Sequence, residues 1–383
     1  MSKKFKKILV ITGTRAEYGL LKSTIDEIIK SKKLELKLLA TGIHTLKKYG
    51  LTLNEIKKDK IPISCIVKVS DHDDMLTSLA KEIAGINKYC LKEKPDLIVV
   101  LGDRDEPFAG AIVGGHLKIP VAHIHGGDVT GYVVDEYIRH SITKFSHLHF
   151  TATQKSYQRV LKLGEENWRV HNVGGPGIDN IKKRKKLDKK ALGKKYGLDI
   201  NKKWFLVVHH PTSLDQLSLI KQVNPLFDVL TERSDIKKIV ILPNSDTGSK
   251  LFIKTINQFK AKKDFYIHPN LTRDDYLNFL ANVDLLIGNS SSGILESGYF
   301  KLPTVNIGNR QKGRECGQNV IHVNCDKDGI NKAVDLALSD KFKKACQKTK
   351  HPYGYGTAGK EIVKLIAKHI DNKDLFYKKF TYA

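Results

Sequence analysis

The chain has 383 residues, more than one ordinary hydrophobic core accommodates, and this length predicts two domains. Lysine and arginine outnumber aspartate and glutamate by 66 to 41, and the net charge of +25 favours anionic partners such as nucleotides, nucleic acid or a membrane surface. The lysines are scattered, and no stripe of basic and aromatic residues accompanies them, so we expect no nucleic-acid partner.

The cysteines and the amino terminus bear on the compartment. Five widely spaced cysteines without a Cys-x-x-Cys pair argue against a disulfide framework and against a structural zinc site. The first residues lack the apolar segment of a signal peptide, and no stretch reaches membrane-spanning length. We therefore expect a cytoplasmic protein with no membrane partner.

Apolar runs alternate with helical spacing through the first half. Strands are predicted at 8–12, 34–40, 63–67, 96–101, 121–124 and 148–151, and helices at 18–29, 74–91, 107–117, 135–145 and 153–163. Residues 170–177 close this half. This alternation predicts a parallel sheet covered on both faces. Ligands of such sheets bind beyond the carboxyl ends of the strands.

A lysine-rich run at 182–190 predicts a linker, after which the alternation restarts. Strands are predicted at 204–208, 236–242, 265–267, 283–287 and 304–307, and helices at 214–230, 249–259, 273–280, 294–300 and 360–370. The predicted fold is α/β, with two Rossmann-like domains facing a cleft. The predicted domains are 1–178 and 190–358, and a final segment, 359–383, packs back on the first.

The segment DLLIGNSSSGILE (284–296) predicts an anion site in the second domain. A strand turns through Ser290 and Ser291 into a helix, whose free N–H groups and dipole attract an anion. The alternative is that Ser290 only caps the helix. The later loop 308–315 adds Arg310, Lys312 and Arg314, which suit a diphosphate.

Polar residues also follow the predicted strands of the first half. Arg15 suits a phosphate, although taken alone it fits a surface turn equally well. The same segment is no GxGxxG fingerprint, so we expect no NAD. Asp103, beside Arg104, is a candidate acid or base, or Asp103 or Asp105 simply caps the next helix.

Histidines and carboxylates follow the next strand. His123 and His125 alternate along it, which predicts that both face one side, but no motif supplies a third metal ligand, and we expect no metal. Asp135 and Arg139 are spaced as an i, i+4 helical pair. In the second half, His209 and His210 point to opposite faces, so one of them can enter a cleft.

These motifs resemble those of the hydrolysing UDP-N-acetylglucosamine 2-epimerases and of their relatives that act on 2,4-diacetamido sugars for legionaminic acid. The matching segments span nearly the whole chain: GTRAEYG (13–19), LGDR (101–104), HIHGGD (123–128), DEYIRHSITK (135–144), HHP (209–211), PNSDTGSK (243–250), IGNSSSG (287–293) and GNRQKGRE (308–315). The resemblance implies a glycosyltransferase-B fold without metal or other cofactor, a UDP-sugar substrate and a homodimer. It also implies elimination of UDP to a glycal, followed by water addition that inverts C2 and supplies N-acetylmannosamine for sialic acid synthesis.

The resemblance also implies roles for individual residues. Substrate-binding roles pass to Arg15, Arg104, Arg139, Ser290, Ser291, Glu296 and Arg310, with the serines on phosphate and Glu296 on the ribose. Catalytic roles pass to Asp103, Asp135 and His210. One position departs: some relatives carry an acid where this chain has His125, so its role passes to Asp128, or His125 acts as the base.

Several alternatives stay open. The sugar could be a UDP- or GDP-2,4-diacetamido sugar. The enzyme could instead be a non-hydrolysing epimerase or a glycosyltransferase of the same fold. A basic nucleic-acid-binding protein is the alternative from another class.

Overall fold

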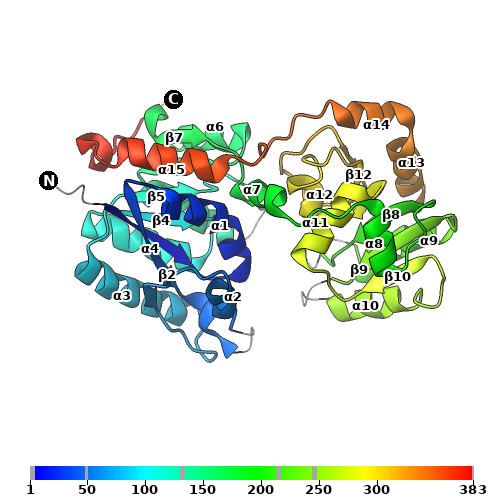
Figure 1. Ribbon diagram of the computed structural model, residues 1–383, viewed down its shortest axis with the longest axis horizontal. Helices are drawn as coiled ribbons and strands as arrows, with labels where there is room; N and C mark the ends of the chain where they lie inside the picture. The colour runs from blue at the N-terminus through cyan, green and yellow to red at the C-terminus, as the bar shows by residue number, and fades with distance from the viewer. Residues whose placement is uncertain (1–4, 48–50, 130–133, 213–216, 244–247, 382–383) are drawn as a thin grey trace. The chain divides into compact units, whose positions relative to one another are not determined.

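The chain forms an α/β protein with two parallel sheets, which confirms the predicted fold class (Figure 1). A computed structural model describes residues 5–47, 51–129, 134–212, 217–243 and 248–381. The chain divides into two compact units, residues 1–182 with 353–383 and residues 183–352.

The first unit is built on a seven-stranded parallel sheet in the order β3-β2-β1-β4-β5-β6-β7. Its strands are β1 (Lys6–Thr12), β2 (Leu34–Ala40), β3 (Cys65–Ile66), β4 (Leu97–Leu101), β5 (Val121–Ile124), β6 (Leu148–Thr151) and β7 (Val170–Asn172). Its helices are α1 (Arg15–Lys30), α2 (Leu53–Lys58), α3 (Met75–Glu93), α4 (Asp105–Leu117), α5 (Val134–Phe145), α6 (Gln154–Lys162), α7 (Pro176–Lys183) and α15 (Ala358–His369).

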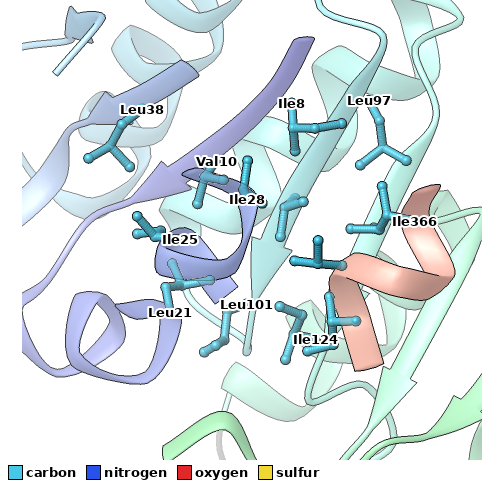
Figure 2. Packing of buried hydrophobic residues seen from close by; sticks show 14 of the residues in the cluster. Ile8, Val10, Leu21, Ile25, Ile28, Leu38, Leu97, Leu101, Ile124 and Ile366 are labelled. Atoms are coloured by element: carbon cyan, nitrogen blue, oxygen red, sulfur yellow. The ribbon is translucent and has the colours of Figure 1, made fainter. Parts of the chain in front are cut away.

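The first sheet is buried on both faces because its strands are apolar at successive positions. In β1, Ile8 and Val10 pack on one face against α1, and Leu9 and Ile11 belong to a separate cluster. Figure 2 shows the first cluster, in which Ile366 of α15 lies beside side chains of the sheet. Each fully buried aliphatic side chain of this kind contributes roughly 1.5–3 kcal/mol. The last helix of the chain is thus part of the core of the first unit.

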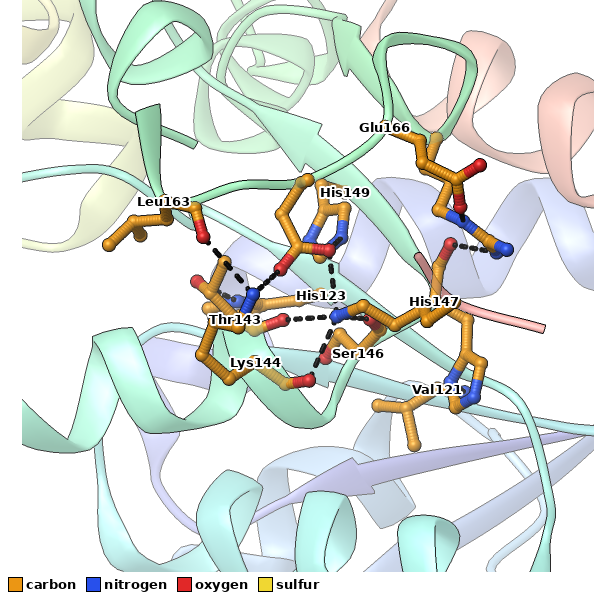
Figure 3. Close-up of polar contacts among 12 residues, drawn as sticks. Val121, His123, Thr143, Lys144, Ser146, His147, His149, Leu163 and Glu166 are labelled. Carbon is orange, nitrogen blue, oxygen red and sulfur yellow. Dashed lines mark hydrogen bonds and ion pairs between the residues drawn. The ribbon is translucent and has the colours of Figure 1, made fainter. Parts of the chain in front are cut away.

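The C-terminal segment is also tied to the first unit by polar contacts. The Lys378 ammonium donates to the carbonyl of Lys144 at 2.8 Å and to that of Ser146 at 2.7 Å. Lys144 is in the last turn of α5, and Ser146 is the first residue after it. Lys144 and His149 in turn contact the buried carboxylate of Glu165 (Figure 3). Burial acts to raise the pKa of Glu165, but His149 and the two lysines outweigh it and lower the pKa to about 2. Carbonyls at a helix end lack partners within the helix, so the contacts of Lys378 with the Lys144 and Ser146 carbonyls cap α5.

The second unit contains a six-stranded parallel sheet in the order β10-β9-β8-β11-β12-β13. Its strands are β8 (Lys203–Val208), β9 (Ile236–Ile241), β10 (Phe265–His268), β11 (Leu285–Gly288), β12 (Thr304–Ile307) and β13 (Val320–Val323). Its helices are α8 (Lys189–Tyr196), α9 (Leu219–Thr231), α10 (Ser249–Asn257), α11 (Arg273–Asn282), α12 (Ser292–Leu295), α13 (Lys327–Leu338) and α14 (Asp340–Gln347).

The predicted linker 182–190 contains the boundary between the two units, and α7 ends and α8 begins within it, with Asp188 capping α8. One expectation about the second unit was wrong. The helix expected at 294–300 is only Ser292–Leu295. It stops because Glu296 leaves the helical conformation, and the Ser297 hydroxyl donates to the Gly293 carbonyl instead.

Candidate functional site

In each unit, some of the candidate residues follow the strands at which the strand order of the sheet reverses direction. In the first unit this point lies between β1 and β4, and in the second between β8 and β11. Crossovers leave such a point in opposite directions, so the loops diverge and open a crevice at the carboxyl ends. Asp103 follows β4, and His210 and Ser290 follow β8 and β11.

Arg139 joins several predicted residues of the first unit. Its side chain is 1% exposed and forms an ion pair with the Asp103 carboxylate. It also donates to the Asp128 backbone carbonyl at 2.7 Å and to the Glu136 carboxylate at 2.6 Å. A buried guanidinium with these partners is held in one orientation. Residues far apart in sequence are thereby brought into one cluster.

His125 and Asp128 form a hydrogen-bonded pair. The strand β5 ends at Ile124 and His125 has φ of +66°, so the expectation that His123 and His125 share one side of a strand was wrong. The His125 Nδ1 lies 2.8 Å from an oxygen of Asp128, and the other oxygen of Asp128 accepts from Ser156 at 2.7 Å. Burial acts to raise the pKa of Asp128, but His125 and Ser156 lower it overall.

His125 carries two signs of a functional residue. A non-glycine residue in the left-handed region is strained by roughly 1–3 kcal/mol, and such strain gathers at active sites. Its Nε2 atom is buried and has no hydrogen-bond partner among the described residues. His123, in contrast, is a core residue bonded to the Gly102 carbonyl and Thr143, and burial lowers its pKa to about 3.

The carboxyl groups after β4 do not cap the next helix. The N-cap of α4 is Arg104, without a side-chain capping bond, and Asp105 is the first helical residue. Asp135 lies in the first turn of α5, where burial and the charge of Asp103 raise its pKa. A carboxyl whose pKa is raised in this way is suited to act as an acid.

The two remaining candidate arginines of the first unit are more exposed than Arg139. The Arg15 side chain is 69% exposed, begins α1 and pairs with Glu55 at 2.9 Å. Arg104 pairs with the buried Glu106 at 3.1 Å. Within the described residues, the ion pair of Arg15 is with Glu55 and not with a member of the Arg139 cluster, so its substrate role stays a prediction.

Three buried glutamates lie under the ends of β1 and β2. Glu106 fills the space that Gly13 and Gly42 leave, because a Cβ on either glycine would stand within 2.4 Å of its side chain. Glu17 and Glu82 are 5% and 1% exposed. Burial and the charge of Glu106 raise the pKa of Glu82 to about 8.

This raised pKa predicts a pH-dependent stability. In the folded state Glu82 keeps its proton up to about pH 8, whereas the unfolded chain releases it near about pH 4.3. The contribution of Glu82 to the free energy of unfolding is therefore complete below about pH 4.3. Stability should fall as pH rises towards about 8 and then level off, a change on the order of a few kcal/mol. Urea unfolding at pH 5.5, 7 and 8.5 measures it.

Glu82→Gln should remove this part of the pH dependence, because the amide does not ionise. Glu35→Gln, at a residue of β2 paired with Lys37, is the control and should leave the profile unchanged. A wild-type free energy of unfolding that rises between pH 5.5 and 8.5, with the same slope in Glu82→Gln, would contradict the assignment.

Hydroxyl contacts hold residues 284–296 of the second unit, here called the serine segment. Ser290 Oγ lies 3.1 Å from Ser292 Oγ, which is bonded to the hydroxyl of Tyr276. Burial and the charge of Glu296 raise the pKa of Tyr276 to about 12. Ser291, and not Ser290, is the N-cap of α12, and it makes no side-chain capping bond. A helix of four residues has little dipole, so hydroxyl and backbone donors must carry any anion binding here.

Glu296 ends α12 and is 9% exposed. Its carboxylate forms an ion pair with Arg273 of α11. The ribose role implied for Glu296 stays a prediction, and it would act with one oxygen engaged by this arginine.

Two adjacent histidines, His209 and His210, follow the end of β8. His209 Nε2 lies 3.0 Å from the Gln222 carbonyl, and its ring stacks on Phe252 at 5.6 Å. Burial lowers the pKa of His209 to about 4. His209 is therefore a core residue, and His210, which is 7% exposed, stays the candidate for catalysis. Arg310 donates to the Asn289 carbonyl at 3.1 Å, next to Ser290.

A cavity of about 410 Å³ lies beside the loop 308–315, which follows β12. It is lined by Gly308, Asn309, Gln311, Lys312, Gly313, Arg314, His322, Val323 and Asn324. Two cations and several amides make this lining suitable for an anionic group. Across the described parts of the chain, no three His, Cys, Asp or Glu side chains are grouped so as to hold a metal ion.

Three polar residues of the site were not anticipated: Arg273, Tyr276 and Asn289. Arg273 and Tyr276 stand one turn apart in the helix after β10. The rule that ligands bind beyond strand ends, applied to β10, would have drawn attention to both. Asn289 lies within the serine segment but carries no motif that distinguishes a ligand contact from a structural one.

The chain was compared with known proteins. Residues 26–367 match the family model described as UDP-N-acetylglucosamine 2-epimerase. This chain is 37% identical to the UDP-N,N'-diacetylbacillosamine 2-epimerase (hydrolyzing) of Legionella pneumophila, and the match covers 94% of this chain and 95% of the relative. It is 34% identical, over 98% of the chain and 97% of the relative, to the polysialic acid biosynthesis protein P7 of Escherichia coli.

A solved structure shares the fold. The crystal structure described as a putative UDP-N-acetylglucosamine 2-epimerase from Listeria monocytogenes superposes with a TM-score of 0.81, at 16% identity, over 99% of this chain and all of that one. None of the helices formed by the described residues has the length and hydropathy that crossing a membrane requires. From the extent of the family match and the identity to these relatives, the chain belongs to the UDP-N-acetylglucosamine 2-epimerase family.

Proposed function

We propose that this protein is a hydrolysing 2-epimerase that converts UDP-N-acetylglucosamine and water into UDP and N-acetylmannosamine. The observation that carries the proposal is the cluster in which Arg139 contacts Asp103 and Asp128, and Asp128 contacts His125. It gathers acid and base groups that follow β4 and β5, next to the point where the strand order of the first sheet reverses. The hydrolysing activity named for the Legionella relative supports the same reaction.

In the proposed first step, a base removes the proton from sugar C2 while the C1–O bond to UDP breaks, leaving a glycal. His125 suits the base, because Asp128 holds its Nδ1 and leaves Nε2 as the acceptor. Asp103 and Asp135 are then the carboxyls that exchange protons with the sugar in the second step. Water then adds its oxygen to C1. A proton enters C2 from the face opposite to the one from which the first proton was removed, so the configuration at C2 is inverted.

The leaving diphosphate gains negative charge as the C1–O bond breaks. Ser290, Ser291 and Arg310 are proposed to hold its phosphates, with Glu296 on the ribose. Donors that meet the developing charge stabilise the transition state more than the ground state. His210, whose backbone is bonded to Asn289 beside Ser290, is proposed to donate a proton to the departing phosphate. Arg15 and Arg104 are proposed as further contacts with the anion.

A second substrate class is favoured by the name of the Legionella relative, which acts on a UDP-2,4-diacetamido sugar. Incubation of the protein with each UDP-sugar, and with the GDP form of the diacetamido sugar, decides between them. Mass spectrometry should find free UDP and free 2-epimeric sugar. An intact epimeric UDP-sugar would point to the non-hydrolysing reaction. Absence of turnover together with salt-dependent binding to DNA or RNA would overturn the enzymatic proposal.

We also propose a cytoplasmic homodimer. Exposed apolar side chains at the start of α3, Met75 at 62% and Leu76 at 78%, support an association surface. Wide cysteine spacing and a nucleotide-sugar substrate support the cytoplasm. Light scattering after size exclusion should give twice the mass of the 43.1 kDa chain, and a monomer at micromolar concentration would contradict this.

A further inference from the structure

Asn289 uses all of its polar groups to join three parts of the second unit. Its own N–H donates to the Val208 carbonyl at 3.0 Å. Its side-chain oxygen accepts from the His210 N–H at 2.7 Å, and its side-chain NH₂ donates to the His210 carbonyl at 2.8 Å. Its carbonyl accepts from Arg310 and Gln311, at 3.1 and 3.0 Å.

This arrangement continues the pairing of β8 and β11 past the end of the sheet. The last backbone pair in the register is Gly288 with Val208. Gly288 has φ of +136°, and a Cβ there would stand 2.0 Å from the Val208 carbonyl oxygen, so only glycine fits. The Asn289 side chain, which has the donor and acceptor of a peptide group, then takes the place of the next backbone partner for His210.

We propose that Asn289 is the positioning residue for His210. The Asn289 side chain, which is 3% exposed, holds both the backbone N–H and the backbone carbonyl of His210. The inference rests on the proposed function for the role of His210 and goes beyond it in naming what orients that residue. A misplacement of about 1 Å costs on the order of 100-fold in rate, so loss of this contact should lower turnover. The Asn289 carbonyl is backbone, so its contact with Arg310 should survive a change of side chain.

The test is Asn289→Asp, which keeps size and acceptor but places a carboxylate oxygen against the His210 carbonyl. It should lower kcat by about 10- to 100-fold and change the UDP dissociation constant by less than about threefold. In a His210→Ala background the same substitution should change kcat by less than about threefold, because the effect acts through His210. An equal loss in both backgrounds overturns the proposal. Asn289→Ser, which cannot reach both groups, is the second variant.

A matched control is Asn319→Asp. Asn319 is fully buried and donates to the Leu302 carbonyl at 2.7 Å, so its substitution carries a similar folding cost away from the site. Hydrogen exchange of the peptide containing His210 gives a readout that does not need turnover. Asn289→Ala should speed exchange of the His210 amide, and Asn319→Asp should not. Unchanged exchange in Asn289→Ala overturns the proposal, whereas an inactive wild type with faster exchange in the variant overturns only the proposed function.

Discussion

Replacement of Asp103 by asparagine is expected to lower kcat by about 100- to 10,000-fold, the range for loss of a general acid or base. The amide keeps the shape of the carboxyl but cannot take or give the proton. The dissociation constant for UDP should change by less than about threefold, because Asp103 is not among the residues proposed to bind the nucleotide. Turnover is measured as UDP release, and binding by calorimetry.

Glu136→Gln is the matched control for this substitution. Glu136 contacts the same Arg139 guanidinium as Asp103, so each variant removes one negative charge from that arginine. We expect Glu136→Gln to lose less than about tenfold in kcat. Equal losses in the two variants would show that Asp103 acts only by holding Arg139, and full activity of Asp103→Asn would remove it from the mechanism.

His210→Ala is expected to lower kcat by a similar factor, about 100- to 10,000-fold, while UDP still binds. The imidazole is proposed to protonate the departing phosphate, and alanine offers no proton. Single-turnover measurements with UDP-N-acetylglucosamine separate this step from release of UDP.

The neighbouring His209 provides the comparison. It is 2% exposed, and its contacts are with Gln222 and Phe252 inside the second unit. His209→Gln should lower the free energy of unfolding by roughly 1–3 kcal/mol and leave kcat close to the wild-type value. Loss of turnover in His209→Gln without loss of stability, together with an active His210→Ala, would exchange the roles of the two residues.

The bounds of four strands could be predicted closely, and three of these strands, β5, β6 and β12, are buried along their whole length. The observed bounds of β2, β5, β6 and β12 coincide with the predicted ones. Strand β13 was missed because it is a four-residue edge strand whose residues are partly exposed, so it lacks a continuous apolar run. Helix α12 was predicted too long because helical spacing does not reveal the hydroxyl contact that ends it.

Within the candidate site, the kinds of residue were predictable and their partners were not. The spacing of Asp135 and Arg139 suggested a helical pair, but the structure shows Arg139 contacting Asp103, 36 residues away in sequence. His125 was expected on a strand, whereas its positive φ brings it to Asp128. These contacts depend on which strand ends are neighbours, and local spacing carries no information on that.

By itself, the amino-acid sequence determined the alternation of strands and helices, the glycine- and serine-rich turns and the residue types after each strand, because these depend on near neighbours in the chain. Only the tertiary structure decided that Asn289 meets His210 and that Arg139 meets Asp103. Strand order places those groups together, and strand order follows from the packing of the whole sheet, not from any one segment.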